Sequence, residues 1–293
     1  MSDYPNKVII SAEAGSVFGE AGRAMAESLQ RSTGHSLTFE NVGNSSGVGG
    51  AEAGAKAEKD GSVVLVCNKG AITSHPHTSK SYRVSDFTPL CQFAEAPIAL
   101  TVGQNSPFNT LADLFDAAKA APDTISYSTP NPYHTQRLAM AGFSEKNGLK
   151  FKFLVIPGGN AENIKQLNDG TVHFAFLAAH NLAEPAAAGA IRVLGVAHGE
   201  RLPFFKSVPT FKEQGYDLIT AIWLGLFAPA GVPQEHLSEI QKFAETAARD
   251  PETVKGIAQL QMVPAFLDRK AFAAKVDTDA SYHLGVLRAL GAL

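Results

Sequence analysis

Strand-like and helix-like segments alternate along nearly the whole chain. Val8 to Ile10 and Val63 to Cys67 are short apolar runs of the kind that form buried strands. Between them, Ala21, Met25 and Leu29 recur at the spacing of an amphipathic helix. The alternation continues into the last third of the sequence and predicts an α/β fold with largely parallel sheets.

The length of the chain favours two lobes. At 293 residues it exceeds the size at which a single hydrophobic core usually stops growing. An apolar run at 97–102 leaves the first set of strand and helix units, and a run at 222–228 is the expected return. We therefore expect lobe 1 to comprise residues 1–101 plus 224–293 and lobe 2 residues 102–223, joined by two crossing strands with a ligand cleft between them.

Charge and composition argue against several classes of partner. Hydrophobic residues make up 45% and charged residues 18% of the chain, which is typical of a folded globular protein. The net charge of −3 provides no basic surface for a phosphate backbone, so no nucleic acid partner is expected. No apolar stretch approaches a membrane span, and Met1 to Pro5 lack the features of a leader. From these residues alone, the protein is expected to be cytoplasmic or to have lost its leader.

The two cysteines allow two interpretations. Cys67 and Cys91 could form one disulfide. Each also lies in an apolar, strand-like run in which a buried free thiol is equally at home. The sequence leaves their disulfide state open.

Several segments match a known family in the same order and at the same spacing. These segments are Tyr4 to Lys7, Phe39 to Asn41, Gly47 to Gly61, Pro76-His77, Asp169 to Val172, Gly189 with Arg192, Ser207 to Gly215 and Trp223 to Pro233. On these residues the chain resembles, over nearly its whole length, the extracytoplasmic solute-binding proteins of tripartite tricarboxylate transporters, the TctC or Bug family.

The resemblance implies a type II periplasmic binding protein fold, in which two α/β lobes close on a ligand. It implies a periplasmic location and a monomer that captures a small dicarboxylate, tricarboxylate or aromatic carboxylate. The ligand would then pass to separate membrane transporter subunits. Neither a cofactor nor catalysis is expected of such a protein.

The chain departs from the family pattern in three loops. Ala14 to Gly19 replaces a glycine-rich turn that usually carries a hydroxyl and an aspartate, so that Phe18 and Gly19 stand in their places. Tyr133 to Arg137 replaces a small-residue segment, and Pro157 to Gly159 replaces the third family loop. These departures leave open which carboxylate is bound and whether it is aromatic or aliphatic.

Loops that follow strands are the expected binding site, because ligands of open α/β sheets bind beyond the carboxyl ends of the strands. Unpaired N–H groups at helix N-termini favour a carboxylate there. The predicted ligand-binding residues are Gly15, Ser16, Val17, Phe18, Asn68, Lys69, Ser128, Thr129, Tyr133, His134, Thr135, Gly159 and Asn160.

Four of these side chains have specific expected roles, each with a plain alternative. Lys69 follows a buried strand and could face an anion, or it could be a solvated surface lysine. His134 could donate to a carboxylate or be an exposed loop histidine. Phe18 and Tyr133 could enclose a planar ligand or simply pack.

Two other functions are alternatives. A ligand-binding sensor that presents its closed form to a membrane signalling protein would look the same in sequence. A serine hydrolase is suggested formally by the G-x-S-x-G match at Gly43 to Gly47, with Asp217 and His236 in the required order, but nothing locates an oxyanion hole. His75 and His77 lack a nearby third ligand, so no metal site is expected.

Overall fold

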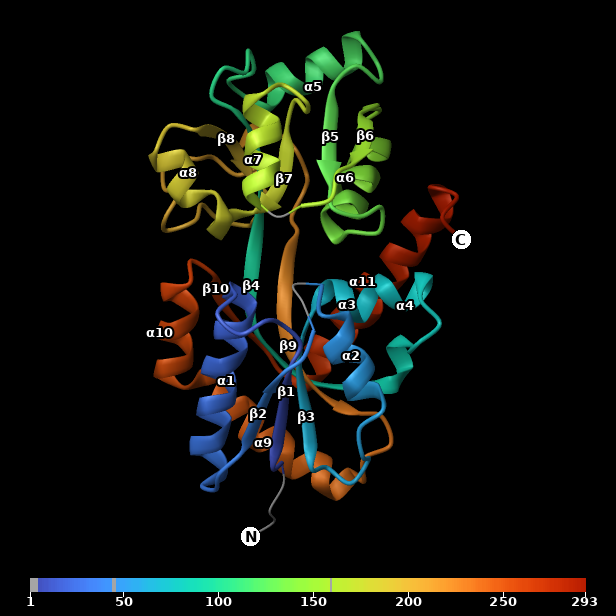
Figure 1. The fold of residues 1–293 in the computed structure, drawn as a ribbon, viewed down its shortest axis with the longest axis vertical. Coiled ribbons are helices and arrows are strands. Elements are labelled where there is room, and N and C mark those ends of the chain that lie inside the picture. The colour runs from blue at the N-terminus through green and yellow to red at the C-terminus, as the bar shows by residue number, and fades with distance from the viewer. Residues whose placement is uncertain (1–4, 44–45, 159) are drawn as a thin grey trace. The chain divides into compact units, whose positions relative to one another are not determined.

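The computed structural model describes residues 5–43, 46–158 and 160–293. The chain forms two compact units: unit 1 comprises Met1–Glu95 and Trp223–Leu293, and unit 2 comprises Ala96–Ile222. The chain leaves unit 1 within strand β4 (Phe87–Gly103) and returns within strand β9 (Ala221–Pro229) (Figure 1). The limits predicted from the sequence, 101/102 and 223/224, fall within the same two strands.

The sheet of unit 1 is mixed. Its strand order is β10-β4-β9-β3-β1-β2. Strand β1 (Lys7–Ile10) pairs in parallel with β2 (Thr38–Asn41) and β3 (Val63–Asn68), whereas β3 with β9 and β4 with β10 (Val263–Leu267) are antiparallel. The expected dominance of parallel pairs is therefore wrong at β4 and β9, because these strands carry the chain out of unit 1 and back rather than belonging to βαβ crossovers.

Unit 1 contains the N-terminal and C-terminal helices. They are α1 (Val17–Thr33), α2 (Val48–Ala55), α3 (Lys69–Thr73), α4 (His75–Thr78), α9 (Gln234–Arg249), α10 (Pro251–Gln259) and α11 (Arg269–Ala289), with a 3-10 turn at Val84–Asp86. Helix α2 begins at Val48, because the left-handed Gly47 (φ 77°) ends the preceding loop. Helix α1 packs against α9 and α10.

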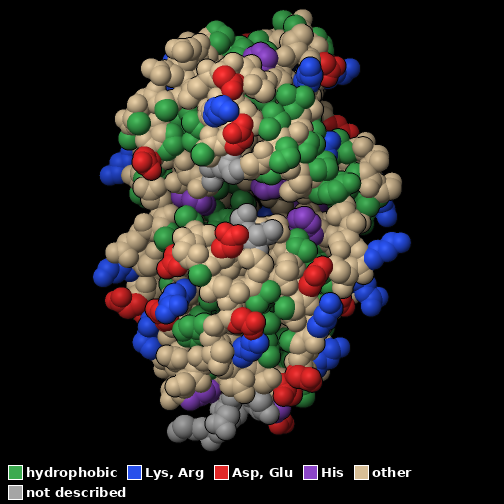
Figure 2. Space-filling view, in the orientation of Figure 1, with side chains coloured by type: hydrophobic (Ala, Val, Ile, Leu, Met, Phe, Trp, Pro, Cys, Tyr) green, Lys and Arg blue, Asp and Glu red, His purple; other side chains and the backbone are tan. Residues whose placement is uncertain are grey.

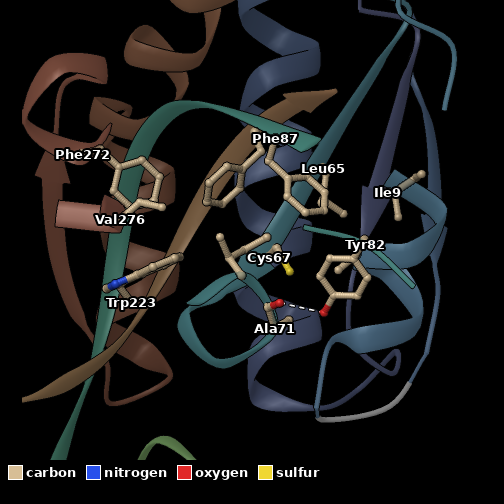
Figure 3. Close-up of a cluster of buried hydrophobic side chains, with 12 residues drawn as sticks. Ile9, Leu65, Cys67, Ala71, Tyr82, Phe87, Trp223, Phe272 and Val276 are labelled. Atoms are coloured by element: carbon tan, nitrogen blue, oxygen red, sulfur yellow. Dashed lines mark hydrogen bonds between the residues drawn. The ribbon is translucent and has the colours of Figure 1, made fainter. Parts of the chain in front are cut away.

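An aromatic cluster forms the core of unit 1 (Figure 3). The ring centroids of Trp223 and Phe272 lie 5.0 Å apart, and those of Phe227 and Phe272 lie 5.2 Å apart. Gly225 makes room for this packing, since an added Cβ would lie 2.2 Å from the Phe272 ring. The core thus joins strand β9 to helix α11.

Unit 2 has a smaller set of strands. Strands β5 (Ser126–Thr129) and β6 (Lys152–Val155) are parallel, and β7 (Ala175–Ala178) and β8 (Ile191–Val196) are antiparallel to the second half of β4. The helices are α5 (Leu111–Ala120), α6 (Thr135–Lys146), α7 (Asn160–Asn168) and α8 (Ala183–Ala187), with 3-10 turns at Ala179–Asn181 and Lys212–Gln214. A capping box of Thr110 and Asp113 starts α5.

Local hydrogen bonds set two element boundaries in unit 2. Helix α6 starts at Thr135, because the Asn131 side chain accepts the N–H of Tyr133 and holds a turn there. Strand β7 begins only at Ala175, because the N–H groups of His173 and Phe174 bond to the carbonyl of Ser126 instead.

Cys67 and Cys91 are both free and buried, so they form no disulfide in this structure. Within the described ranges, no helix combines the length and the apolar character needed to cross a bilayer.

Candidate functional site

Three loops of unit 1 meet at one edge of its sheet. Strands β1, β2 and β3 are parallel neighbours, so the segments that follow them emerge on the same side. The Asn41 side chain donates to the carbonyl of Ala12 at 2.9 Å, and the Asn68 side chain donates to the carbonyl of Ser46 at 3.2 Å. These bonds join the three loops into one surface.

The loop before α1 is fixed by its own side chains. The Ser16 hydroxyl donates to the carbonyl of Glu13 at 2.7 Å and accepts from the N–H of Gly19 at 3.1 Å, which caps the helix. The Gly15 N–H donates to the Glu20 carboxylate at 3.0 Å. Two groups predicted to hold a ligand carboxylate, the Gly15 amide and the Ser16 hydroxyl, are therefore already engaged within the protein.

Asn68 lies where β3 turns into α3. Its side-chain oxygen accepts from the N–H of Ala71 at 3.1 Å and caps α3, while its amide group donates to Ser46. The approach is close, since a Cβ added to Gly47 would lie 2.5 Å from that amide nitrogen. Asn68 thus sets the distance between the loop that follows β2 and the segment that follows β3.

Lys69 forms a nearly buried ion pair. Its exposed fraction is 7%, and its ammonium lies 3.0 Å from Oδ1 of Asp279 in α11. The other oxygen of Asp279 accepts from the indole N–H of Trp223 at 2.7 Å. The protein itself therefore supplies a counter-charge for Lys69, and Trp223 of β9 holds the residue that supplies it.

A neighbouring histidine extends this contact between α3 and α11. His283 is 1% exposed, and its Nδ1 lies 3.0 Å from the Thr73 hydroxyl, which donates to the carbonyl of Lys69 at 2.6 Å. Burial, with a smaller effect from the charge of Lys69, lowers the pKa of His283 to about 3. His283 is thus a neutral group at neutral pH.

In unit 2, Ser128 and Thr129 close the carboxyl end of β5. Both are buried, at 0% and 2% exposure. The Ser128 hydroxyl lies 3.1 Å from the side-chain oxygen of Gln166, and the Thr129 hydroxyl donates to the carbonyl of Asn131 at 2.7 Å. A ligand that accepted from either hydroxyl would have to displace an internal bond.

The start of α6 is more accessible. Tyr133, His134 and Thr135 are each half-buried. The guanidinium of Arg137, one turn further on, lies 4.1 Å from the centroid of the Phe153 ring and anchors the helix to β6. Gly159 lies outside the described residues, and of Asn160 only its place as the first residue of α7 is described.

The sequence of the chain matches the model of a defined family, the tripartite tricarboxylate transporter family receptor (TctC), over residues 21–288. The chain belongs to this family. Among curated relatives, a UPF0065 protein in the tcbD-tcbE intergenic region of Pseudomonas sp. strain P51 is 26% identical over 249 residues, which covers 81% of this chain and 72% of the relative.

Solved structures share the fold. A TctC solute-binding protein from Polaromonas, solved with no ligand, superposes with a TM-score of 0.82 at 24% identity and covers 98% of both chains. A protein from R. palustris, Rpa4515 with adipate, gives a TM-score of 0.79 at 22% identity and covers 99% of this chain and 98% of that protein. The fold expected from the resemblance, that of the periplasmic solute-binding proteins, is confirmed.

Within this TctC fold, the predicted site residues fall into one group in each unit. Gly15 to Phe18 and Asn68-Lys69 come from one sheet edge in unit 1. In unit 2, Ser128-Thr129 form the end of strand β5, and Tyr133 to Thr135 follow it. The contacts of these residues with a ligand stay a prediction.

Two residues that contact the segment after β3 were not predicted from the sequence: Asp279 pairs with Lys69, and His283 contacts Thr73. Asp279 and His283 lie in α11, and no helix was expected there. The signal was present, because Phe272, Val276, Ala280 and His283 recur at helical spacing and all are buried.

The residues of the hydrolase alternative make other contacts. Asp217 accepts from Lys146 at 2.7 Å, and His236 lies 2.6 Å from the carbonyl of Asp60. Ser45 lies outside the described residues. Among the residues that are described, no three His, Cys, Asp or Glu side chains are grouped as metal ligands.

The surface carries charges of both signs. Figure 2 shows Lys and Arg side chains interspersed with Asp and Glu over the face drawn. With a net charge of −3, this pattern favours a small-molecule ligand over a polyanionic partner.

Proposed function

We propose that this chain is a periplasmic binding protein that captures a small carboxylate and delivers it to the membrane subunits of a tripartite tricarboxylate-type transporter. The observation that carries this proposal is the match to the family's receptor model over residues 21–288. The R. palustris relative named with adipate supports a carboxylate as the class of ligand. No bond is made or broken in this function.

The proposed ligand contacts come from the loops at the ends of parallel strands. In unit 1 they are Gly15 to Phe18 with Asn68 and Lys69, and in unit 2 they are Tyr133 to Thr135. Ser128, Thr129, Gly159 and Asn160 complete the second group. Phe18 and Tyr133 set the shape of the ligand that is accepted, because they are large side chains at positions where the family resemblance expects small or polar ones.

Thermal unfolding against a panel of ligands tests the carboxylate. A ligand that binds only the folded state stabilises it by about 2.7 kcal/mol at one hundred times its Kd. We expect one of adipate, citrate, malate, benzoate or glutamate to raise the Tm, while the uncharged diamide of adipate does not. Folded protein, freed of ligand by unfolding and refolding, that responds to none of these carboxylates would refute the assignment.

Closure and delivery need separate measurements. Closure of the two units on the ligand predicts a smaller radius of gyration by solution X-ray scattering when the best carboxylate is added. Delivery predicts that cells lacking this protein lose uptake of that carboxylate and regain it with the gene restored. Ligand binding without a change in the radius of gyration or in uptake would show that the protein binds the carboxylate but does not serve its transport.

The same preparations test location and assembly. A periplasmic monomer is released from cells by osmotic shock and elutes from a sizing column at the mass of one chain, 30.9 kDa. Retention with the cytoplasmic fraction, or elution at twice that mass, would contradict the corresponding part of the proposal.

A further inference from the structure

Helix α11 contacts the segment after strand β3 through three consecutive polar interactions. Asp279 pairs with Lys69, the carbonyl of Ala280 accepts from Nε2 of His77 at 3.0 Å, and His283 meets Thr73. The segment 69–77 includes only the short helices α3 and α4. Because such short helices are marginal alone, the long α11 supplies the rigidity of this segment.

We propose that Asp279 is a positioning residue, which holds the ammonium of Lys69 in the orientation needed to meet the ligand carboxylate. This inference rests on the proposed function and assigns a role to a residue outside the predicted site. Asp279 acts through Lys69 and does not itself touch the ligand.

The geometry of the pair supports positioning. A lysine side chain has four flexible carbons and loses rotamer entropy when it is fixed. Here the ammonium is fixed before a ligand arrives, by Oδ1 of Asp279 at 3.0 Å. Fixing a contact group in advance lowers the entropy cost of binding.

Asp279 is itself held in place. The Trp223 indole N–H donates to its Oδ2 at 2.7 Å, and the Trp223 ring is fully buried against Phe272. The side-chain exposure of Asp279 is 17%, compared with 9% for that of Lys69. The Asp279 carboxylate is thus fixed by Trp223 and in turn fixes Lys69.

Burial makes Lys69 sensitive to its partner. Because only 7% of the residue is exposed, a small displacement of the ammonium decides whether a ligand can reach it. Removing one partner of a buried ion pair leaves the other charge without compensation. The loss of Asp279 should therefore disturb the position of Lys69 more than the loss of a surface partner would.

The test is a double-mutant cycle on ligand affinity. Wild type is titrated calorimetrically with adipate, citrate and benzoate, and its best ligand is used for Asp279→Asn, Lys69→Met and the double variant. We expect each single change to raise Kd at least tenfold. If Asp279 acts through Lys69, the double variant should bind within about twofold of Lys69→Met.

A matched control is available on the same helix. Lys275 of α11 pairs with Glu95 of β4 at 2.5 Å and not with a residue of α3. Lys275→Met should lower the Tm without changing Kd, which separates a loss of stability from a loss of positioning. All titrations are made well below the Tm of the weakest variant.

A milder variant covers the case in which Asp279→Asn does not fold. Trp223→Phe keeps a buried ring but removes the N–H donor to Asp279, and should raise Kd about two- to fivefold. Its fold is checked by circular dichroism, since Trp223 is the single tryptophan of the chain.

The outcomes distinguish this inference from the proposed function. A wild type that binds none of the probes overturns both. A wild type that binds, with Asp279→Asn binding equally well, overturns positioning alone. Tighter binding by Asp279→Asn would also overturn it, because Asp279 would then be a competitor of the ligand for Lys69.

Discussion

The Oγ atom of Ser16 lies 3.1 Å from the backbone nitrogen of Gly19 and caps helix α1. The same oxygen donates its proton to the carbonyl of Glu13, so the hydroxyl is engaged on both sides. The bend of the loop also depends on Gly19, since an added Cβ would lie 2.0 Å from the Glu13 oxygen. Ser16 therefore has a structural role whether or not a ligand contacts it.

Ser16→Ala should destabilise the protein by about 1 kcal/mol, because it removes an N-cap bond. The free energy of unfolding in urea measures the change. Ser16→Thr keeps a capping hydroxyl and should lose much less. Ser238→Ala, at an exposed serine within α9, is the matched control and should change stability by less than about 0.5 kcal/mol. Equal stability of Ser16→Ala and wild type would show that the cap contributes nothing.

Two glycines should respond in opposite directions to the same substitution. Gly225→Ala places a methyl group 2.2 Å from the Phe272 ring in the core, so we expect a loss of about 1–3 kcal/mol. Gly285→Ala in α11 meets no atom within 4 Å and should gain about 0.5–1 kcal/mol from helix propensity. Thermal unfolding of both variants measures the difference, and shifts of the same sign would contradict the packing described here.

Much of the fold could be predicted from the sequence because apolar periodicity dominates it. The runs at Val8 and Val63 became β1 and β3, and the helical spacing of Met25 and Leu29 became α1. Strand direction was harder to predict, because periodicity reports which face is buried but not which way a neighbouring strand runs. The antiparallel pairing of β9 with β3 is such a case.

The site was only partly accessible to sequence reasoning. Glycines and strand ends indicated the loops, but the partners of a side chain depend on tertiary contacts. Lys69 has its partner Asp279 in α11, a helix that was not anticipated. The Ser128 hydroxyl donates to Gln166 at 0% exposure, and no local sequence pattern encodes this internal partner.

The cysteine thiols should be unreactive in the native protein. Burial raises the pKa of Cys67 to about 12, and it also raises the pKa of Cys91. Because the thiolate is the reactive form, a disulfide reagent at pH 8 should label neither thiol in folded protein and both in urea. The absorbance of the thiolate that the reagent releases on reaction counts the labelled cysteines. Rapid labelling under native conditions would show that one strand opens readily.

His283 should make stability depend on mildly acidic pH. Burial lowers its pKa to about 3 from an ordinary value of 6.5, with Lys69 and His77 adding to the effect and Asp279 opposing it. Between these values the unfolded chain binds a proton that the folded protein excludes. Stability from this group is therefore complete above about pH 6.5 and is lost as the pH falls toward 3.

The slope of that loss is the measurable quantity. One excluded proton contributes at most about 1.4 kcal/mol per pH unit, and His283→Gln removes it while keeping a polar partner for Thr73. Half-buried His180, whose pKa is lowered by burial to about 4, adds its own slope equally to wild type and variant. Urea unfolding at pH 7, 6, 5 and 4 should therefore show the stability advantage of wild type shrinking as the pH falls. Parallel curves would mean that His283 has the same pKa in the folded and the unfolded protein. The contact between α3 and α11 would then hold a charged imidazole as the pH falls, in spite of its burial.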